Sequence, residues 1–218
     1  MKSYPSIPSS RDRTIPIGQP CLGFMKYDGS NLRWEWSKKQ GWHKFGTRNR
    51  LFGPEEAPYN QAIPIFLEHI GPIVEENIRH EFKGVQEIVA FTEFMGPSSF
   101  AGSHVLEEPK ALKLIDVSVY KKGIIPPRHF MKLFGKHDFA PELLYEGNFS
   151  RELIFGVRAG VYDRPVDVFG GFNNIPFEGM VCKGADHRGQ VWMAKIKTDA
   201  YLNKLRAAFG DEWAKYGE

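Results

Sequence analysis

The strand-like and helix-like segments of this chain do not follow one another in strict alternation. Runs rich in β-branched and aromatic side chains come in neighbouring pairs, and the helix-like runs stand between these pairs. Parallel strands need a long crossover, usually a helix, whereas antiparallel strands can be joined by a short turn. The order of the segments therefore favours an α+β fold with antiparallel sheets and flanking helices over a doubly wound α/β fold.

Two hairpins are expected. Residues 31–36 alternate polar and apolar side chains, and residues 41–47 can form their antiparallel neighbour. Residues 178–183 and 190–197 are strand-like runs on either side of a polar turn, which predicts a second hairpin. We expect the tryptophans of the first hairpin to pack in its own core.

Further elements are predicted from hydrophobic spacing and capping residues. Two core strands are expected over residues 85–94 and 111–120. Helices are expected over residues 72–82, near 128–134, near 150–155 and over 198–216, where Thr198 begins the last one.

Length and composition indicate one globular domain. The 218 residues are 42% hydrophobic and 25% charged, and the absence of an apolar run of about 18 residues excludes a membrane protein. A net charge of +3 is too small to indicate a nucleic-acid partner. Two cysteines, no zinc-like spacing and no signal peptide predict a cytoplasmic protein. We expect an N-terminal arm over residues 1–20 and a single domain over 21–218.

The most informative short motif is Lys26-Tyr-Asp-Gly-Ser-Asn31, predicted to form a loop before the strand at residues 31–36. A lysine amine attacks phosphorus only when neutral, so its site must lower the pKa of the amine through burial or neighbouring cations. Glycine lets the backbone come close to a phosphate. Taken alone, however, the motif is better explained as a surface turn at a hairpin.

Further motifs follow in a fixed order: Thr47-Arg48, Glu93-Phe-Met-Gly96, Leu114-Ile-Asp-Val117, Glu178-Gly-Met-Val-Cys-Lys183 and Lys195-Ile-Lys197. With the Lys26 motif, their order and spacing resemble the covalent lysyl-nucleotidyltransferases, which comprise RNA ligases, DNA ligases and mRNA-capping guanylyltransferases. The Lys-x-x-Gly-x-Asn and Glu-Gly-x-Val-x-Lys forms resemble the ATP-dependent RNA ligases, especially the short phage-type enzymes. The resemblance spans residues 26–197 and implies the nucleotidyltransferase (ATP-grasp-like ligase) fold.

The resemblance implies an ATP-dependent RNA ligase. Lys26 would attack the α-phosphorus of ATP, expel pyrophosphate and carry AMP as a covalent lysyl-AMP. The AMP would then pass to a 5′-phosphate RNA end, and a 3′-hydroxyl would attack to seal the strand. ATP and Mg²⁺ are the implied cofactors and RNA with 5′-phosphate and 3′-hydroxyl ends is the implied partner. Whether an RNA-binding or repair partner is also needed stays open.

The resemblance also implies roles for the other motif residues. Glu178 matches a catalytic carboxylate that helps unload the lysine proton or holds the metal, and Lys195 and Lys197 match contacts to the α-phosphate. Arg48 would hold a phosphate, and Glu93 the ribose hydroxyls. The residues expected to bind the nucleotide besides Lys26, Lys195 and Lys197 are Asn31, Arg48, Glu93, Ile115, Asp116, Val181 and Lys183.

The sequence departs from the family pattern at two points. Ile115 stands where the family usually has an aromatic residue stacked on adenine, so an aliphatic floor opposite Val181 would replace stacking. Only 21 residues follow Lys197, which leaves no room for the OB-fold of DNA ligases and capping enzymes. The alternatives that stay open are a DNA-nick ligase, a GTP-dependent guanylyltransferase and a non-catalytic RNA-end-binding module.

Overall fold

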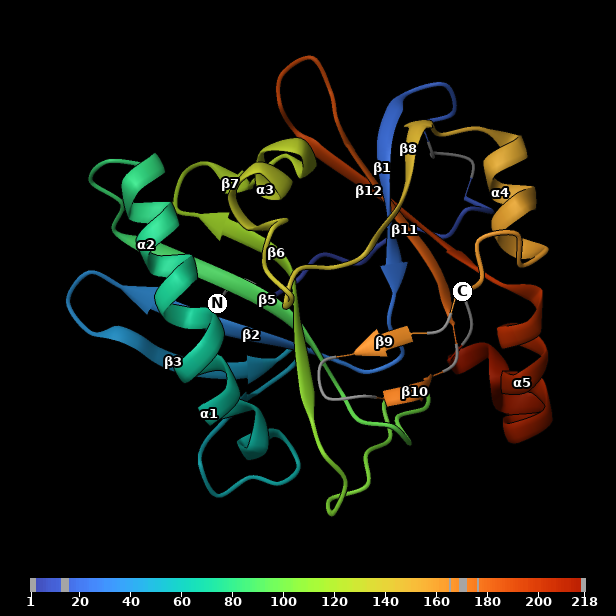
Figure 1. Cartoon of the computed structure of the whole chain (residues 1–218), viewed down its shortest axis with the longest axis horizontal. Helices are drawn as coiled ribbons and strands as arrows, with labels where there is room; N and C mark the ends of the chain where they lie inside the picture. The colour runs from blue at the N-terminus through green and yellow to red at the C-terminus, as the bar shows by residue number, and fades with distance from the viewer. Residues whose placement is uncertain (1–2, 13–15, 165, 169–171, 176, 217–218) are drawn as a thin grey trace.

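Two antiparallel sheets form the frame of the molecule (Figure 1). The computed structural model describes residues 3–12, 16–164, 166–168, 172–175 and 177–216. The larger sheet has six strands in the order β4-β3-β2-β5-β6-β7, and the smaller has four in the order β12-β11-β1-β8. Strands β9 and β10 form a separate two-stranded ribbon. The predicted α+β architecture with antiparallel sheets is confirmed.

The strands are β1 (Pro20–Lys26), β2 (Ser30–Ser37), β3 (Gly41–Thr47), β4 (Leu51–Phe52), β5 (Glu87–Met95), β6 (Ala111–Val119), β7 (Gly123–Ile124), β8 (Leu143–Asn148), β9 (Val166–Val168), β10 (Phe172–Ile175), β11 (Gly179–Ala185) and β12 (Val191–Lys197). The α-helices are α1 (Ala62–Ile65), α2 (Gly71–Glu81), α3 (Pro127–Phe134), α4 (Arg151–Arg158) and α5 (Asp199–Phe209). Short segments of other helix types are η1 (Tyr59–Gln61), η2 (Phe66–Ile70) and η3 (Gly210–Lys215).

The six-stranded sheet buries the largest apolar cluster under α1, η2 and α2, which cover one of its faces (Figure 1). Trp34 is fully buried, and its ring stacks on Phe66 at 4.1 Å between centroids. Its indole nitrogen donates to Thr92 Oγ1 at 2.9 Å, so the polar atom of this core residue keeps a partner. The predicted first hairpin is β2–β3, and its tryptophans Trp34 and Trp36 pack in the core as expected.

The four-stranded sheet holds a second core against α4. Strand β1 lies between β11 and β8, and its Met25 packs with Cys182 and Val157. The predicted loop position of Lys26 is wrong, because Lys26 is the last residue of β1. This strand is buried on both faces, so its sequence lacks the alternation that marks a half-buried strand.

The predicted helices are present at α2, α3, α4 and α5, and the second hairpin is present as β11–β12. Thr198 caps α5 by accepting a hydrogen bond from the backbone of Tyr201 at 3.0 Å. The last helix is shorter than expected: it ends at Phe209 because Gly210 takes a φ of +53°, and η3 follows. Within the described ranges, no helix combines the length and apolar character needed to cross a bilayer.

Candidate functional site

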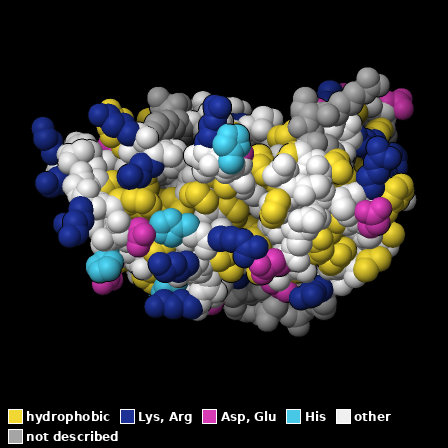
Figure 2. Space-filling model, turned by 90° about the horizontal axis from the view of Figure 1, so that it is seen from above, with side chains coloured by type: hydrophobic (Ala, Val, Ile, Leu, Met, Phe, Trp, Pro, Cys, Tyr) yellow, Lys and Arg dark blue, Asp and Glu magenta, His cyan; other side chains and the backbone are white. Residues whose placement is uncertain are grey.

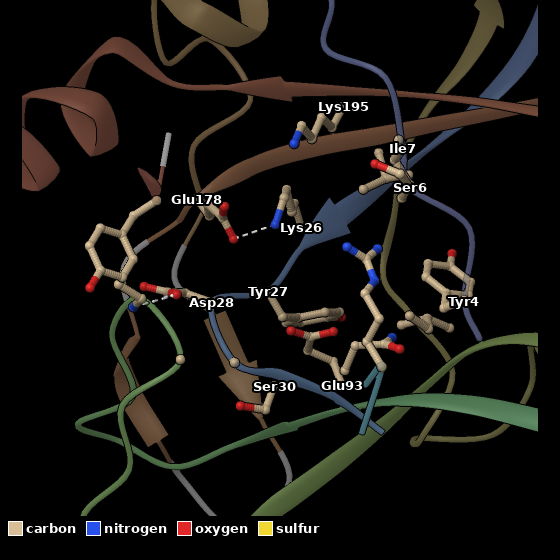
Figure 3. A pocket seen from close by; sticks show the side chains of 18 of the residues that line it. Tyr4, Ser6, Ile7, Lys26, Tyr27, Asp28, Ser30, Glu93, Glu178 and Lys195 are labelled. Carbon is tan, nitrogen blue, oxygen red and sulfur yellow. Dashed lines mark hydrogen bonds and ion pairs between the residues drawn. The ribbon is translucent and has the colours of Figure 1, made fainter. Parts of the chain in front are cut away.

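A cavity of about 780 Å³ lies between the two sheets. Its lining comes from the end of β1, the start of β2, strands β5, β6, β11 and β12, and residues 4–7 of the N-terminal arm. This volume is within the usual range for a small-molecule site. Figure 3 shows Lys26, Glu178 and Lys195 together at this cavity. The cavity therefore joins residues that are far apart in the sequence.

The centre of the cavity wall is a lysine–glutamate–lysine cluster. Lys26 Nζ lies 2.6 Å from Glu178 Oε2, and Lys197 Nζ lies 2.9 Å from the other oxygen, Oε1. Glu178 is 3% exposed, so its charge is removed from water and balanced by the two ammonium groups. Lys197 also donates to the carbonyl oxygen of Tyr216 at 2.7 Å.

Strand register explains why these three residues meet. Lys26 of β1 lies opposite Gly179 of β11, and Gly179 lies opposite Lys197 of β12. Glu178 immediately precedes Gly179, so it lies at the same end of the four-stranded sheet as Lys26 and Lys197. Gly179 has a φ of +150°, and a Cβ on it would come within 1.9 Å of the carbonyl oxygen of Ile196. Only glycine fits there, which accounts for the Glu-Gly pair in the sequence.

The charges of this cluster set the protonation of Lys26. Burial lowers the pKa of Lys26, but the carboxylates of Glu178 and Glu93 raise it by more, so the net pKa is above its ordinary value. Burial raises the pKa of Glu178, but Lys26 and Lys197 outweigh burial and leave that pKa below its ordinary range. The lowered lysine pKa expected from the sequence is therefore wrong for this state, because carboxylates rather than cations surround the amine.

Two more carboxylates face the cluster. Burial, assisted by the negative charge of Glu178, raises the pKa of Glu93 to about 8, although Lys26 partly opposes the shift. Burial and Glu178 also raise the pKa of Asp28 to about 6. The backbone N–H of Ala101 donates to Asp28 Oδ1 at 2.8 Å. The site thus holds more acidic groups than the two lysines bound to Glu178 can neutralise.

Most residues expected at the site do line this cavity. Besides the lysine–glutamate–lysine cluster, they are Asn31, Arg48, Glu93, Ile115, Val181, Lys183 and Lys195. Asn31 and Glu93 lie opposite each other on β2 and β5. Asp116 instead lies behind the wall, 2% exposed, where it accepts a hydrogen bond from Lys183 at 2.7 Å. Lys183 also donates to the carbonyl oxygen of Ile115 at 2.7 Å, so this lysine joins the two sheets.

Comparison with known proteins identifies the fold. No protein-family model and no curated protein matches the sequence. Among solved structures, a mutant RNA ligase of Naegleria gruberi with AMP and Mn has a TM-score of 0.63 and 18% identity, covering 94% of this chain and 58% of that one. An archaeal ATP-dependent RNA ligase has a TM-score of 0.62 and 16% identity, covering 97% and 52%. This chain has the nucleotidyltransferase fold of ATP-dependent ligases.

A third structure extends the likeness beyond RNA ligases. A protein from Aquifex aeolicus, provisionally named an ATP-dependent DNA ligase, has a TM-score of 0.59 and 18% identity, covering 99% of this chain and 57% of that one. The present chain spans less than two thirds of the length of each of these three ligases. The nucleotidyltransferase fold expected from the motifs is confirmed.

The acidic groups of this nucleotidyltransferase fold suit a divalent cation that also binds phosphate. The negative charge of Glu178 raises the pKa of both Asp28 and Glu93, and that of Asp28 also raises the pKa of Glu93. Within the described residues, no three His, Cys, Asp or Glu side chains are arranged as a complete metal cage. Mg²⁺ is usually held by one or two carboxylates together with substrate phosphates and water, so this donor set fits it.

The N-terminal arm contributes to the cavity, which was not predicted from the sequence. Tyr4, Ser6 and Ile7 line it, although residues 1–20 were expected to form only a leader. Their sequence carries no periodicity or motif that would have indicated this. Tyr201 of α5 also lines the cavity, whereas its helical spacing predicted only core packing.

Proposed function

We propose that this protein is an ATP-dependent RNA ligase whose first step transfers AMP from ATP to Lys26. The observation that carries the proposal is the 2.6 Å contact between Lys26 Nζ and Glu178 Oε2 on the wall of the cavity. Around it the site supplies a nucleophile, a carboxylate that holds it, and further lysines to oppose phosphate charge.

In this first step, Lys26 Nζ would form a bond to the α-phosphorus of ATP while the bond from that phosphorus to pyrophosphate breaks. The ammonium must lose one proton before the attack and a second as the N–P bond forms. Glu178, with its lowered pKa, is suited to aim the amine and would be a weak proton acceptor at neutral pH. Lys195 and Lys197 would stabilise the charge that develops on the α-phosphate.

Glu178, with Glu93 or Asp28 as a second carboxylate, would hold Mg²⁺ beside the nucleotide together with its phosphates and water. Bound there, Mg²⁺ would screen the phosphates and oppose the positive charge of Lys26, which favours the neutral amine. Alternatively, the carboxyl oxygens of Glu93 would accept hydrogen bonds from the ribose hydroxyls.

RNA with a 5′-phosphate and a 3′-hydroxyl is the substrate that we propose for the later steps. The Lys-x-x-Gly-x-Asn and Glu-Gly-x-Val-x-Lys motifs and two RNA ligases of the same fold support RNA. On the face seen from above, Lys and Arg side chains lie at separate places with other side chains between them (Figure 2). Arg48 is exposed and lines the cavity, so its guanidinium would be available to a 5′-phosphate.

Covalent labelling tests the first step. The purified protein is incubated with α-labelled ATP or GTP and Mg²⁺, then analysed by denaturing gel and intact mass. Label from ATP that disappears in Lys26→Ala but persists in Lys44→Ala, an exposed lysine on β3, is the expected result. Label retained by Lys26→Ala would mean that another lysine is the nucleophile.

The other outcomes decide between the alternatives. Label from GTP alone would favour a guanylyltransferase, and no label on a folded protein would favour a non-catalytic RNA-end-binding module. Labelled protein is then offered nicked RNA and nicked DNA of the same sequence. Sealing of DNA but not RNA would replace the proposed substrate with a DNA nick.

A further inference from the structure

The cavity is lined by both charged and apolar side chains. Lys26, Glu178 and Lys197 form a charged cluster, where phosphates would be balanced. Ile115 and Ile7 also line the cavity and belong to the apolar cluster that contains Val89 and Phe91. The flat faces of a nucleobase are apolar, so a nucleotide with its phosphates at the lysines would direct its base toward the isoleucines.

The N-terminal arm is attached to the wall of the cavity at three places. The hydroxyl of Tyr4 donates to Asp116 Oδ2, and Tyr4 itself is 6% exposed, with its ring centroid 4.9 Å from that of Phe91. Arg48 Nη2 donates to the carbonyl oxygen of Pro5 at 3.1 Å. These contacts fix the arm immediately before Ser6 and Ile7.

The third attachment is a short parallel pairing with β12. The backbone N–H of Lys195 donates to the carbonyl oxygen of Pro8 at 2.9 Å, and the N–H of Ser10 donates to the carbonyl oxygen of Lys195 at 2.8 Å. Ser6 and Ile7 are thus held between two anchored points. Figure 3 shows them beside Lys26 and Lys195, with the Ser6 hydroxyl directed toward the cavity.

The buried pair of Lys183 and Asp116 explains why the arm stays in place. Lys183 is 4% exposed and donates to Asp116 Oδ2, the same oxygen that accepts from Tyr4. The positive charge of Lys183 stabilises the carboxylate in the interior, and the carboxylate in turn holds the tyrosine hydroxyl. Asp116 therefore connects strand β6 and strand β11 to the arm.

We infer that residues 4–7 of the arm are a specificity-determining wall of the nucleotide site. Ile7, beside Ile115, contacts the face of the base, and the Ser6 hydroxyl contacts its polar edge. Tyr4 is a positioning residue that holds this wall through Asp116. This inference rests on the proposed function, which supplies its ligand, a purine nucleotide. It assigns discrimination between purine bases to the arm.

Binding of AMP and GMP measures the role of the arm apart from catalysis, because neither nucleotide has a pyrophosphate to expel. Calorimetric titrations compare the full chain with Ile7→Ala and Ser6→Ala. We expect Ile7→Ala to weaken AMP binding about tenfold, since it removes apolar contact with the base. We expect Ser6→Ala to reduce the AMP-to-GMP affinity ratio severalfold. The controls are Ile17→Ala, an exposed residue that does not line the cavity, and Ser3→Ala.

Tyr4→Phe tests the positioning role while keeping the ring that packs on Phe91. We expect a severalfold higher KM for ATP in the labelling reaction with an unchanged rate at saturating ATP. Tyr120→Phe, at a side chain 42% exposed and away from the cavity, is the matched control. A change in the saturated rate with no change in KM would contradict the assignment of Tyr4.

The inference is overturned if the folded wild type binds neither AMP nor GMP, or if Ile7→Ala and Ser6→Ala bind both as the wild type does. Its failure is distinguishable from failure of the proposed function. If only the inference about the arm fails, Lys26 would still be labelled by ATP while the arm variants bind nucleotide normally. If only the proposed function fails, Lys26 would take no label while AMP binding still depended on Ile7 and Ser6.

Discussion

Lys26 and Glu178 form a 2.6 Å ion pair between residues that are 152 positions apart in the sequence. Their contact is made at one end of the four-stranded sheet, where β1 ends and β11 begins. Glu178 is almost fully buried, whereas the side chain of Lys26 keeps 22% exposure toward the cavity. The pair therefore holds the amine in place while leaving it accessible from the cavity.

Replacing Glu178 with Gln should affect both stability and chemistry. The buried ammonium of Lys197 and the partly exposed ammonium of Lys26 would lose their common counter-charge, which should lower the free energy of unfolding by about 3 kcal/mol. Covalent labelling of Lys26 should slow by about a hundredfold or more. Urea unfolding and timed labelling measure the two effects. Glu146→Gln, which breaks an exposed ion pair with Arg128, should lower the free energy of unfolding by no more than about 1 kcal/mol. Equal effects of the two variants would contradict the central role of Glu178.

The rate of labelling should rise with pH. The pKa of Lys26 is raised by its carboxylate neighbours despite burial, so only a small fraction of the amine is neutral near pH 7. That fraction should grow roughly tenfold per pH unit, and the labelling rate with it. Single-turnover labelling at ATP well below saturation, between about pH 6 and pH 9, measures the slope, because that rate reports the pKa of the free enzyme. A rate independent of pH in this interval would show that the amine is already neutral.

Lys195→Ala and Lys197→Ala should each slow the covalent step by about a hundredfold, the usual effect of removing one charge contact from a transition state. Stopped labelling reactions at saturating ATP give the rate. Lys39→Ala, in the exposed turn between β2 and β3, is the matched control and should react as the wild type does. Normal rates for both cavity variants would remove these lysines from the phosphate site.

Glu93 should make the protein less stable as pH rises through the range between its unfolded and folded pKa values. Its folded pKa, raised by burial to about 8, exceeds the ordinary value of 4.5, so the folded state binds more protons in this interval. Between pH 5 and pH 8, the free energy of unfolding of the wild type should therefore fall by at least about 1 kcal/mol relative to that of Glu93→Gln. Urea unfolding at both pH values measures the difference, and Glu87→Gln, at an exposed position on the same strand, is the matched control. A constant difference would mean that Glu93 is ionised throughout.

Ile115→Phe should tighten AMP and ATP binding by about threefold to tenfold, since an aromatic ring adds stacking to the burial that isoleucine provides. Calorimetric titration with AMP measures the change. Ile17→Phe, at an exposed position, should leave the affinity unchanged. Unchanged or weaker binding by Ile115→Phe would place the base elsewhere in the cavity.

Local pattern was sufficient for much of the fold. The hairpins β2–β3 and β11–β12 and the helix α2 were predicted because alternation and helical spacing are properties of short segments. Strand β1 was missed because it is buried on both faces and its partners, β8 and β11, are distant in the sequence. The order of the motifs likewise indicated which side chains would share a cavity.

The sequence by itself determined which reactive groups the site contains: a lysine, a carboxylate with a following glycine, and two lysines spaced to share one face of a strand. Only the tertiary structure decided how that chemistry is arranged. It raised the pKa of Lys26 instead of lowering it, placed Asp116 behind the wall, and added Ile7 to the cavity. Charge coupling and burial depend on distances between segments far apart in the chain, and local sequence does not contain those distances.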